Sequence, residues 1–174
     1  MSVRRAVRRR RPDRRPRSEA TAPDDPDAAR LAALKLLNRR DYCAAELSAR
    51  LAERGFAAPA AQAAIDGLVR ERLVDDERFV EYYVRAHAER GQGPVRIAHE
   101  LKELGVAQDL VERAVDASDG RWRERCVALR RRRFGEQPPS EWKERGRQAR
   151  FLTYRGFSAE QVRAALGNDI GLDE

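Results

Sequence analysis

One spacing constrains the fold of this chain more than any other feature. The pattern Leu-x-x-x-Gly, followed by an apolar residue, occurs at Leu51–Phe56, Leu101–Val106 and Leu152–Phe157, so that its glycines recur at intervals of 50 and 51 residues. Such a period is typical of helical units that stack, because a unit of this size has too little core to be stable alone. The sequence therefore predicts a tandem array of helical repeats.

Each copy of the pattern belongs to a unit of three predicted helices. A first helix precedes the pattern at residues 28–39, 76–90 and 120–134, and apolar side chains at helical spacing continue beyond the glycine. Helices of about 10–15 residues are marginal alone in water, so each must pack against its neighbours. In the first unit, the side chains expected to line these helices are Leu31, Leu34, Leu37, Leu47, Leu51, Ala61, Ile65, Leu68 and Val69.

The predicted fold is all-α, an elongated and curved array of three tandem three-helix repeats at residues 28–74, 75–118 and 119–167. An Arg-rich arm, residues 1–27, precedes the repeats, and an acidic tail, residues 168–174, follows them. The arm has nine arginines, five acidic residues and four prolines, and its low apolar content predicts disorder. It either contacts phosphates non-specifically or is a solvated tail, and the sequence leaves both readings open.

The middle repeat has the clearest helix boundaries. Asp75 and Asp76 are suited to capping the helix that follows them, and their charge suits its N-terminus. Gly91 can adopt the left-handed conformation beyond a helix end, and Pro94 fits the first turn of the next helix. Between these boundaries, helical spacing predicts one buried stripe made of Phe79, Tyr82, Tyr83 and Ala86.

The same stretch carries a family resemblance. The run LVDDERFVEYYV, followed by RGQGPVRIAHELKELGV, resembles the signature of the RecX family, regulators of the bacterial recombinase RecA. With the internal repeat, the resemblance covers residues 28 to about 166. It implies a regulator that binds the RecA filament and modulates its ATPase, strand-exchange and filament-extension activities in recombination, DNA repair and the SOS response. We expect the protein to be a monomer and not an enzyme. The family is chiefly associated with inhibition, and the sequence leaves the sign of the regulation open.

Uneven charge points to a candidate binding surface in the third repeat. Residues 120–166 carry a net charge of +8, whereas residues 28–119 carry −2. The third repeat is therefore expected to meet an acidic partner or the DNA held in the filament, or else to present a solvated helix face. Tyr42, Trp142 and Tyr154 either stack on bases or belong to the core. The candidate surface residues are Arg130, Arg131, Arg132, Arg133, Lys143, Arg147 and Arg150.

A free-standing DNA-binding protein is the alternative function. Three-helix units with basic faces are similar to helix-turn-helix modules. Such a protein would bind bare DNA tightly with a steep salt dependence, whereas a filament regulator would bind bare DNA weakly.

Other classes of function have little support in the sequence. Asp75 to Glu77 lie at a helix start, and His87 and His99 lack a second ligand at i, i+4, so neither group predicts a metal site. The segment Gly91-Gln92-Gly93 lacks the strand and third glycine of a nucleotide fingerprint. We therefore expect no cofactor and no catalytic site. The lack of a signal-like or membrane-spanning apolar run, and the wide separation of Cys43 and Cys126, predict a cytoplasmic protein.

Cys43 departs from the pattern of the resembled family, which usually has a hydroxyl residue at this point. Cys43 and Glu46 stand where a capping box would place Ser or Thr and a Glu three residues later. Sulfur is a weak acceptor, which predicts a poorly made cap. The alternative is that Cys43 is simply a small buried residue.

Overall fold

The computed structural model describes residues 22–116 and 121–167, and all the regular elements in these residues are helices. The all-α prediction is therefore confirmed. Most of the predicted arm and all of the predicted acidic tail lie outside the described residues. The helices are α1 (Pro26–Leu37), α2 (Ala44–Glu53), α3 (Ala58–Arg70), α4 (Asp76–Glu89), α5 (Pro94–Glu103), α6 (Gln108–Asp116), α7 (Trp122–Phe134), α8 (Trp142–Tyr154) and α9 (Ala159–Ala165).

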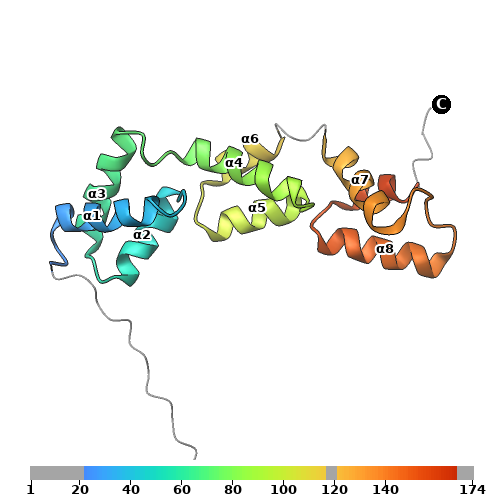
Figure 1. The fold of residues 1–174 in the computed structure, drawn as a ribbon, viewed down its shortest axis with the longest axis horizontal. Coiled ribbons are helices and arrows are strands. Elements are labelled where there is room, and N and C mark those ends of the chain that lie inside the picture. Colours follow the sequence, from blue (N-terminus) through green and yellow to red (C-terminus); the bar gives the residue numbers. More distant parts are fainter. Residues whose placement is uncertain (1–21, 117–120, 168–174) are drawn as a thin grey trace, which may run out of the picture.

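The helices form three groups that follow one another along the long axis of the molecule (Figure 1). Repeat 1 holds α1 to α3, repeat 2 holds α4 to α6, and repeat 3 holds α7 to α9. In each repeat the first helix packs against the third. The predicted elongated array of three-helix repeats is confirmed.

The recurring Leu-x-x-x-Gly pattern is a helix C-terminal motif that also turns the chain into the next helix. Its glycines, Gly55, Gly105 and Gly156, have φ of 91°, 82° and 90°. In every repeat the residue after the glycine donates its N–H to the leucine carbonyl at 3.2 Å. This is the bond of a Schellman motif, which satisfies a carbonyl at the helix end and favours glycine in the left-handed position.

Two buried clusters hold the array together. One lies in repeat 1 around Leu47, Leu51 and Leu68, which are all 0% exposed, and ends at Val74. The other runs through repeats 2 and 3 and includes Trp122, which donates its ring N–H to the Val115 carbonyl at 3.1 Å. Repeats 2 and 3 therefore share one continuous core.

Some predicted core positions are wrong. Leu31, Val69 and Tyr82 are 57%, 46% and 54% exposed. In α1 the buried side chains are Ala29, Ala33 and Leu36, and α3 faces them with Ala60, Ala61 and Ala64. Small residues allow the two helices to pack closely, which leaves the larger side chains at the rim.

In α4 the buried stripe consists of Phe79, Val80, Val84 and Ala88.

Candidate partner-binding surface

The basic residues of α7 do not form one exposed surface, because Arg130 is buried. Arg130 is 1% exposed, and its guanidinium donates to the carbonyl oxygens of Glu136 and Gln137 at 2.7 and 2.8 Å. The prediction that Arg130 belongs to the surface is therefore wrong. Its side chain instead anchors the loop between α7 and α8, where backbone carbonyls replace the water that a buried cation loses.

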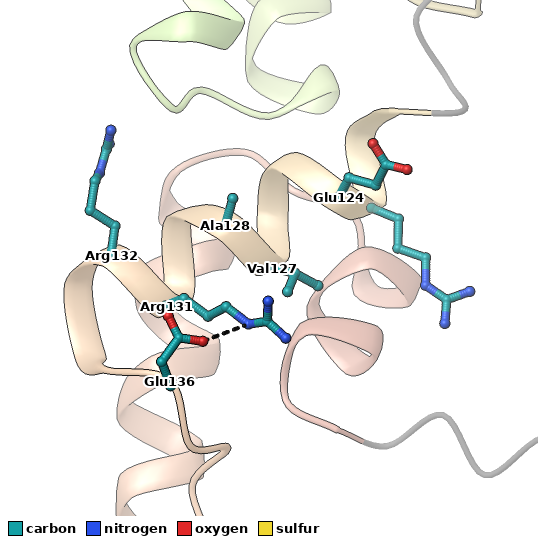
Figure 2. A pocket seen from close by; sticks show the side chains of 7 residues that line it. Glu124, Val127, Ala128, Arg131, Arg132 and Glu136 are labelled. Atoms are coloured by element: carbon teal, nitrogen blue, oxygen red, sulfur yellow. Dashed lines mark ion pairs between the residues drawn. The ribbon is translucent and has the colours of Figure 1, made fainter.

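Arg131 and Arg132 are exposed and line a groove on α7 of about 700 Å³. Figure 2 shows Val127 and Ala128 between these arginines and Glu124, with Glu136 opposite Arg131. The Nε of Arg131 lies 3.4 Å from a Glu136 carboxylate oxygen, and both side chains are more than half exposed. Such a pair contributes little to stability, so Arg131 can exchange Glu136 for another anion.

Arg133 and Arg147 meet at Phe134, although they come from different helices. Their guanidinium carbons lie 5.9 and 5.4 Å from the centre of the Phe134 ring, within cation–π range. Phe134 makes an edge-on contact with Phe151 of α8, with ring centres 5.3 Å apart. The aromatic pair thus joins α7 to α8 and brings two of the predicted site residues together.

Lys143, Arg147 and Arg150 occupy one face of α8, since they are four and three residues apart. All three are exposed. Tyr154, one helical turn beyond Arg150, extends this face and is 76% exposed. The α8 face therefore combines positive charge with an accessible aromatic ring.

The three aromatic candidates for base stacking fall into different environments. Tyr42 is 8% exposed and belongs to the repeat 1 core, with Arg40 over its ring at 3.8 Å. Trp142 is 86% exposed and Tyr154 is 76% exposed. Stacking is therefore open to Trp142 and Tyr154 only, and a core role for Tyr154 is wrong.

Sequence reasoning missed the residues that join repeat 2 to repeat 3. Arg155 donates its Nε to the Gly91 carbonyl at 3.0 Å, and its own carbonyl accepts from Gly93 N at 2.8 Å. The Gly156 carbonyl accepts from Val95 N at 3.0 Å. The sequence feature that could have indicated this role is the position of Arg155, immediately before the glycine of the Leu-x-x-x-Gly pattern.

The join between repeats 1 and 2 is made by residues at positions equivalent to those that join repeats 2 and 3. The Asp76 carboxylate accepts from Ala44 N at 2.8 Å, so Asp76 caps a helix of the previous repeat. The predicted cap of its own helix is made by Asp75, which accepts from Arg78 N at 3.0 Å. Cys43 lies at the N-cap of α2, as predicted, and also donates its S–H to the Leu104 carbonyl of repeat 2 at 3.5 Å.

A polar network fixes α4 to α5 at the second join. Glu100 accepts from Arg96 Nε at 2.8 Å and from the Tyr83 hydroxyl at 3.1 Å, and it lies 3.3 Å from His87 Nδ1. Burial would raise the pKa of Glu100, but the bonds from Arg96 and Tyr83 outweigh it and lower that pKa. Burial and the nearby Glu100 charge raise the pKa of Tyr83 to about 12. The network therefore has a structural role, since Glu100 contacts side chains of both α4 and α5.

Neither a metal centre nor a membrane span is found in the described part of the chain. Within residues 22–116 and 121–167, no three histidine, cysteine or acidic side chains converge as metal ligands. Burial raises the pKa of the Cys126 thiol to about 12, which keeps it protonated and a poor ligand. None of the described helices combines the length and the hydrophobicity that a membrane span requires.

Comparison with known proteins gives one consistent result. The family descriptions of the first, second and third three-helix domains of RecX match residues 29–68, 75–115 and 122–166. The Regulatory protein RecX of Halorhodospira halophila is 45% identical over 148 residues, which is 85% of this chain and 91% of that protein. That of Pseudomonas syringae pv. tomato is 37% identical over 150 residues, 86% of this chain and 97% of that protein. The crystal structure of RecX from Lactobacillus salivarius superposes with a TM-score of 0.72 at 21% identity, covering 83% of this chain and 96% of that one.

Proposed function

Because the chain belongs to the RecX family of regulatory proteins, we propose that it binds the RecA recombinase filament and inhibits its ATPase, strand-exchange and extension activities. In this role the protein acts without catalysis, as a monomer in the cytoplasm. The observation that carries the proposal is the exposed basic surface of repeat 3 at one end of a long, regular array.

The shape of the array suits a filament. An elongated series of repeats offers a long surface that can follow a groove and touch successive protomers at once (Figure 1). A ligand changes a filament's behaviour only if it binds one state better than another. Contacts that span neighbouring protomers meet this condition, because they depend on how those protomers are arranged.

Repeat 3 would supply the electrostatic part of the contact. Its exposed cations come from two helices and would face acidic filament surface or the phosphates of the bound strand. Trp142 and Tyr154 add rings able to stack on exposed bases. The residues proposed for this contact are Arg131, Arg132, Arg133, Lys143, Arg147 and Arg150.

The test is RecA-dependent ATP hydrolysis on single-stranded DNA, titrated with wild-type protein and with the triple variant Arg131→Glu, Arg132→Glu, Arg133→Glu. We expect the variant to need at least about tenfold more protein for equal inhibition, equivalent to about 1.4 kcal/mol. Its thermal melt should stay close to that of the wild type, because all three side chains are exposed. Equal inhibition by a folded variant would contradict the proposed surface.

A matched control reverses three exposed cations of repeat 1 instead, in the variant Lys35→Glu, Arg39→Glu, Arg70→Glu. The two variants have the same net charge, so only the position of the change differs. We expect the control to inhibit like the wild type. If both variants lose inhibition equally, overall charge rather than the repeat 3 surface determines binding.

The alternative of a free-standing DNA-binding protein is tested by the same proteins on bare DNA. Tight binding with a steep loss of affinity between low and physiological salt would support it. Weak binding to bare DNA, with strong binding to RecA-coated DNA, supports the filament regulator.

A further inference from the structure

A cleft of about 340 Å³ lies between repeats 1 and 2, and we call it the α4 cleft. One wall is a single face of α4 and its C-cap, because its residues follow helical spacing. The loop between α1 and α2 supplies the opposite wall with Arg40 and Asp41. The residues of the α4 wall are Phe79, Tyr82, Tyr83, Ala86, His87 and Arg90.

The α4 wall contains the aromatic stripe that helical spacing predicts to be buried, yet the chain leaves most of it uncovered. Tyr82 is 54% exposed, and Tyr83 and Ala86 are only half-buried. Phe79, at 7% exposure, is the most buried member of the predicted stripe. An open aromatic surface with polar residues around it is typical of a binding site.

The rings of this wall are held in fixed positions. The ring centres of Phe79 and Tyr83 are 5.8 Å apart, and those of Tyr83 and His87 are 3.8 Å apart with nearly parallel planes. The Tyr83 hydroxyl donates to Glu100 at 3.1 Å, and His87 Nδ1 lies 3.3 Å from the same carboxylate. A ligand that binds here therefore loses little free energy to ordering the site.

Two cations beside the cleft are available to an anion. Arg85 and Arg90 are exposed, and within the described residues neither of them pairs with a carboxylate. The guanidinium carbon of Arg85 lies 5.6 Å from the centre of the Tyr82 ring. Arg40 is different, because it pairs with the buried carboxylate of Glu46. A phosphate is therefore expected near Arg85 and Arg90 rather than near Arg40.

The remaining polar groups of the cleft accept hydrogen bonds. Asp41 contributes an exposed carboxylate. His87 Nδ1 faces two acceptors, the Gln92 side-chain oxygen and Glu100, so in the neutral ring Nδ1 carries the proton and Nε2 is an acceptor. An acidic peptide would be repelled by Asp41, whereas the exocyclic amino group of a nucleobase donates to a carboxylate. The cleft thus favours a flat ring with amino donors and an attached phosphate.

We propose that the α4 cleft binds an unpaired nucleotide whose base carries an amino group. The base lies against Tyr82, its amino group donates to Asp41, and its phosphate faces Arg90. This site is separate from the repeat 3 surface, and it does not depend on the proposed function. Since one wall belongs to repeat 1 and the other to repeat 2, the nucleotide would bridge the first join.

The experiment follows ¹H–¹⁵N NMR spectra of the full chain, without RecA, during titration with deoxycytidine monophosphate. We expect saturable shifts of the Tyr83, Ala86 and His87 amides. Tyr82→Ala should weaken binding at least about fivefold, the effect of losing one stacked ring, and Tyr82→Phe should keep it. The control Tyr154→Ala removes an exposed ring of repeat 3 and should leave the affinity unchanged. Unchanged affinity in a folded Tyr82→Ala variant would overturn the proposal.

Two further ligands test which parts of the nucleotide are recognised. Deoxyribose phosphate, which lacks a base, should not shift the cleft amides. Thymidine monophosphate, which has no amino group, should bind more weakly than deoxycytidine monophosphate, and Asp41→Asn should reduce this difference. Equal binding of deoxyribose phosphate and deoxycytidine monophosphate would show that only the phosphate is held, which would contradict a nucleotide site.

A short oligo-deoxycytidine strand distinguishes the two sources of such a nucleotide. It is titrated into the variant Arg131→Glu, Arg132→Glu, Arg133→Glu, which weakens binding of the strand to repeat 3. Tighter binding of the strand than of deoxycytidine monophosphate at the cleft amides identifies a nucleic-acid strand as the ligand, and equal binding per nucleotide identifies the free nucleotide. No saturable shift with either ligand would overturn the proposal. Cleft shifts that depend on protein concentration alone would also overturn it, because a second copy would then occupy the cleft.

Discussion

The two joins between repeats occupy equivalent places but use different chemistry. At both, the glycine turn of one repeat lies against the start of the middle helix of the repeat before it. At the first join the bonds to that helix come from side chains: Asp76 bonds Ala44 N, and the Cys43 thiol bonds Leu104 O. At the second join two bonds run between backbones, from Gly93 and Val95 to the carbonyls of Arg155 and Gly156, and the Arg155 side chain adds a bond to the Gly91 carbonyl.

The difference in chemistry comes from how closely the chains approach. A Cβ on Gly93 would lie 2.3 Å from the Gly156 carbonyl oxygen, so the two backbones touch directly. At the first join a Cβ placed on Gly105 would lie 2.8 Å from the Cβ of Ala45, which is a side-chain atom. Backbone contact leaves no room for a side chain to adjust, whereas side-chain caps tolerate change. We therefore expect the second join to be the more sensitive to substitution.

The largest expected effect is that of Gly156→Ala. The new Cβ would lie 2.2 Å from the Cβ of Arg96, and the residue has a φ of 90° that alanine adopts at a cost. Overpacking and backbone strain together should destabilise the protein by about 3 kcal/mol or more. Urea unfolding followed by circular dichroism measures this loss.

The matched control is Gly135→Ala, which separates strain from packing. Gly135 has a φ of 96°, but a Cβ there would have no atom within 4 Å. Its φ of 96° with a ψ of 169° is a conformation essentially restricted to glycine, so the cost should be that of the strained backbone alone, about 1–3 kcal/mol. Equal losses for the two variants would show that the close contact at the second join contributes nothing.

A smaller effect is expected for Asp76→Ala at the first join. Loss of this cap should destabilise by about 1 kcal/mol. Hydrogen exchange should show that α2 amides, such as that of Leu51, lose protection while those of repeat 3 do not. The control Asp75→Ala removes a cap of the same kind inside repeat 2. If Asp75→Ala lowers the protection of the α2 amides as much as Asp76→Ala does, then the cap that Asp76 makes across the first join does not stabilise repeat 1.

The repeats could be predicted from the sequence because the residues that define each one lie close together in the chain. A leucine, a left-handed glycine and an apolar residue form a complete C-terminal motif within six residues, so its recurrence could be seen without a structure. The Asp75 cap is equally local. Asp76 was assigned to the same helix because its true partner, Ala44, lies 32 residues earlier in the chain and is brought near only by stacking.

The candidate site was less predictable, since exposure depends on packing between distant segments. Four consecutive arginines look alike in sequence, yet Arg130 is buried because the loop after α7 folds back and offers two carbonyls. The groove required Glu136 and Arg123, which no sequence motif connects to the arginine run. The α8 face was easier, because Lys143, Arg147 and Arg150 lie at helical spacing.

A gain in stability is expected for Cys43→Ser. The sulfur accepts from Glu46 N at 3.5 Å and is fully buried, and the reciprocal half of the predicted capping box is absent because Glu46 pairs with Arg40. A hydroxyl is the stronger acceptor and can still donate to Leu104 O, so the variant should gain about 0.5–1 kcal/mol. A neutral or negative change in urea unfolding would mean that burial of the sulfur outweighs the cap.

The smallest effect concerns pH at the second join, where Glu100 holds the Arg96 side chain beside Gly156. The folded state lowers the pKa of Glu100 below its ordinary value of 4.5, so its contribution is complete above that pH and is lost as pH falls below it. Glu100→Gln should therefore cost about 0.5 kcal/mol at pH 7, and the difference from wild type should shrink in acid. The control Glu103→Gln alters an exposed carboxylate of the same helix region, 67% accessible, and should show no such trend. The test is to measure the urea unfolding midpoints of the wild type and of Glu100→Gln at pH 7 and at about pH 3. If the midpoints differ by the same amount at both pH values, the packing of the Glu100 side chain, rather than its charge, supports the join.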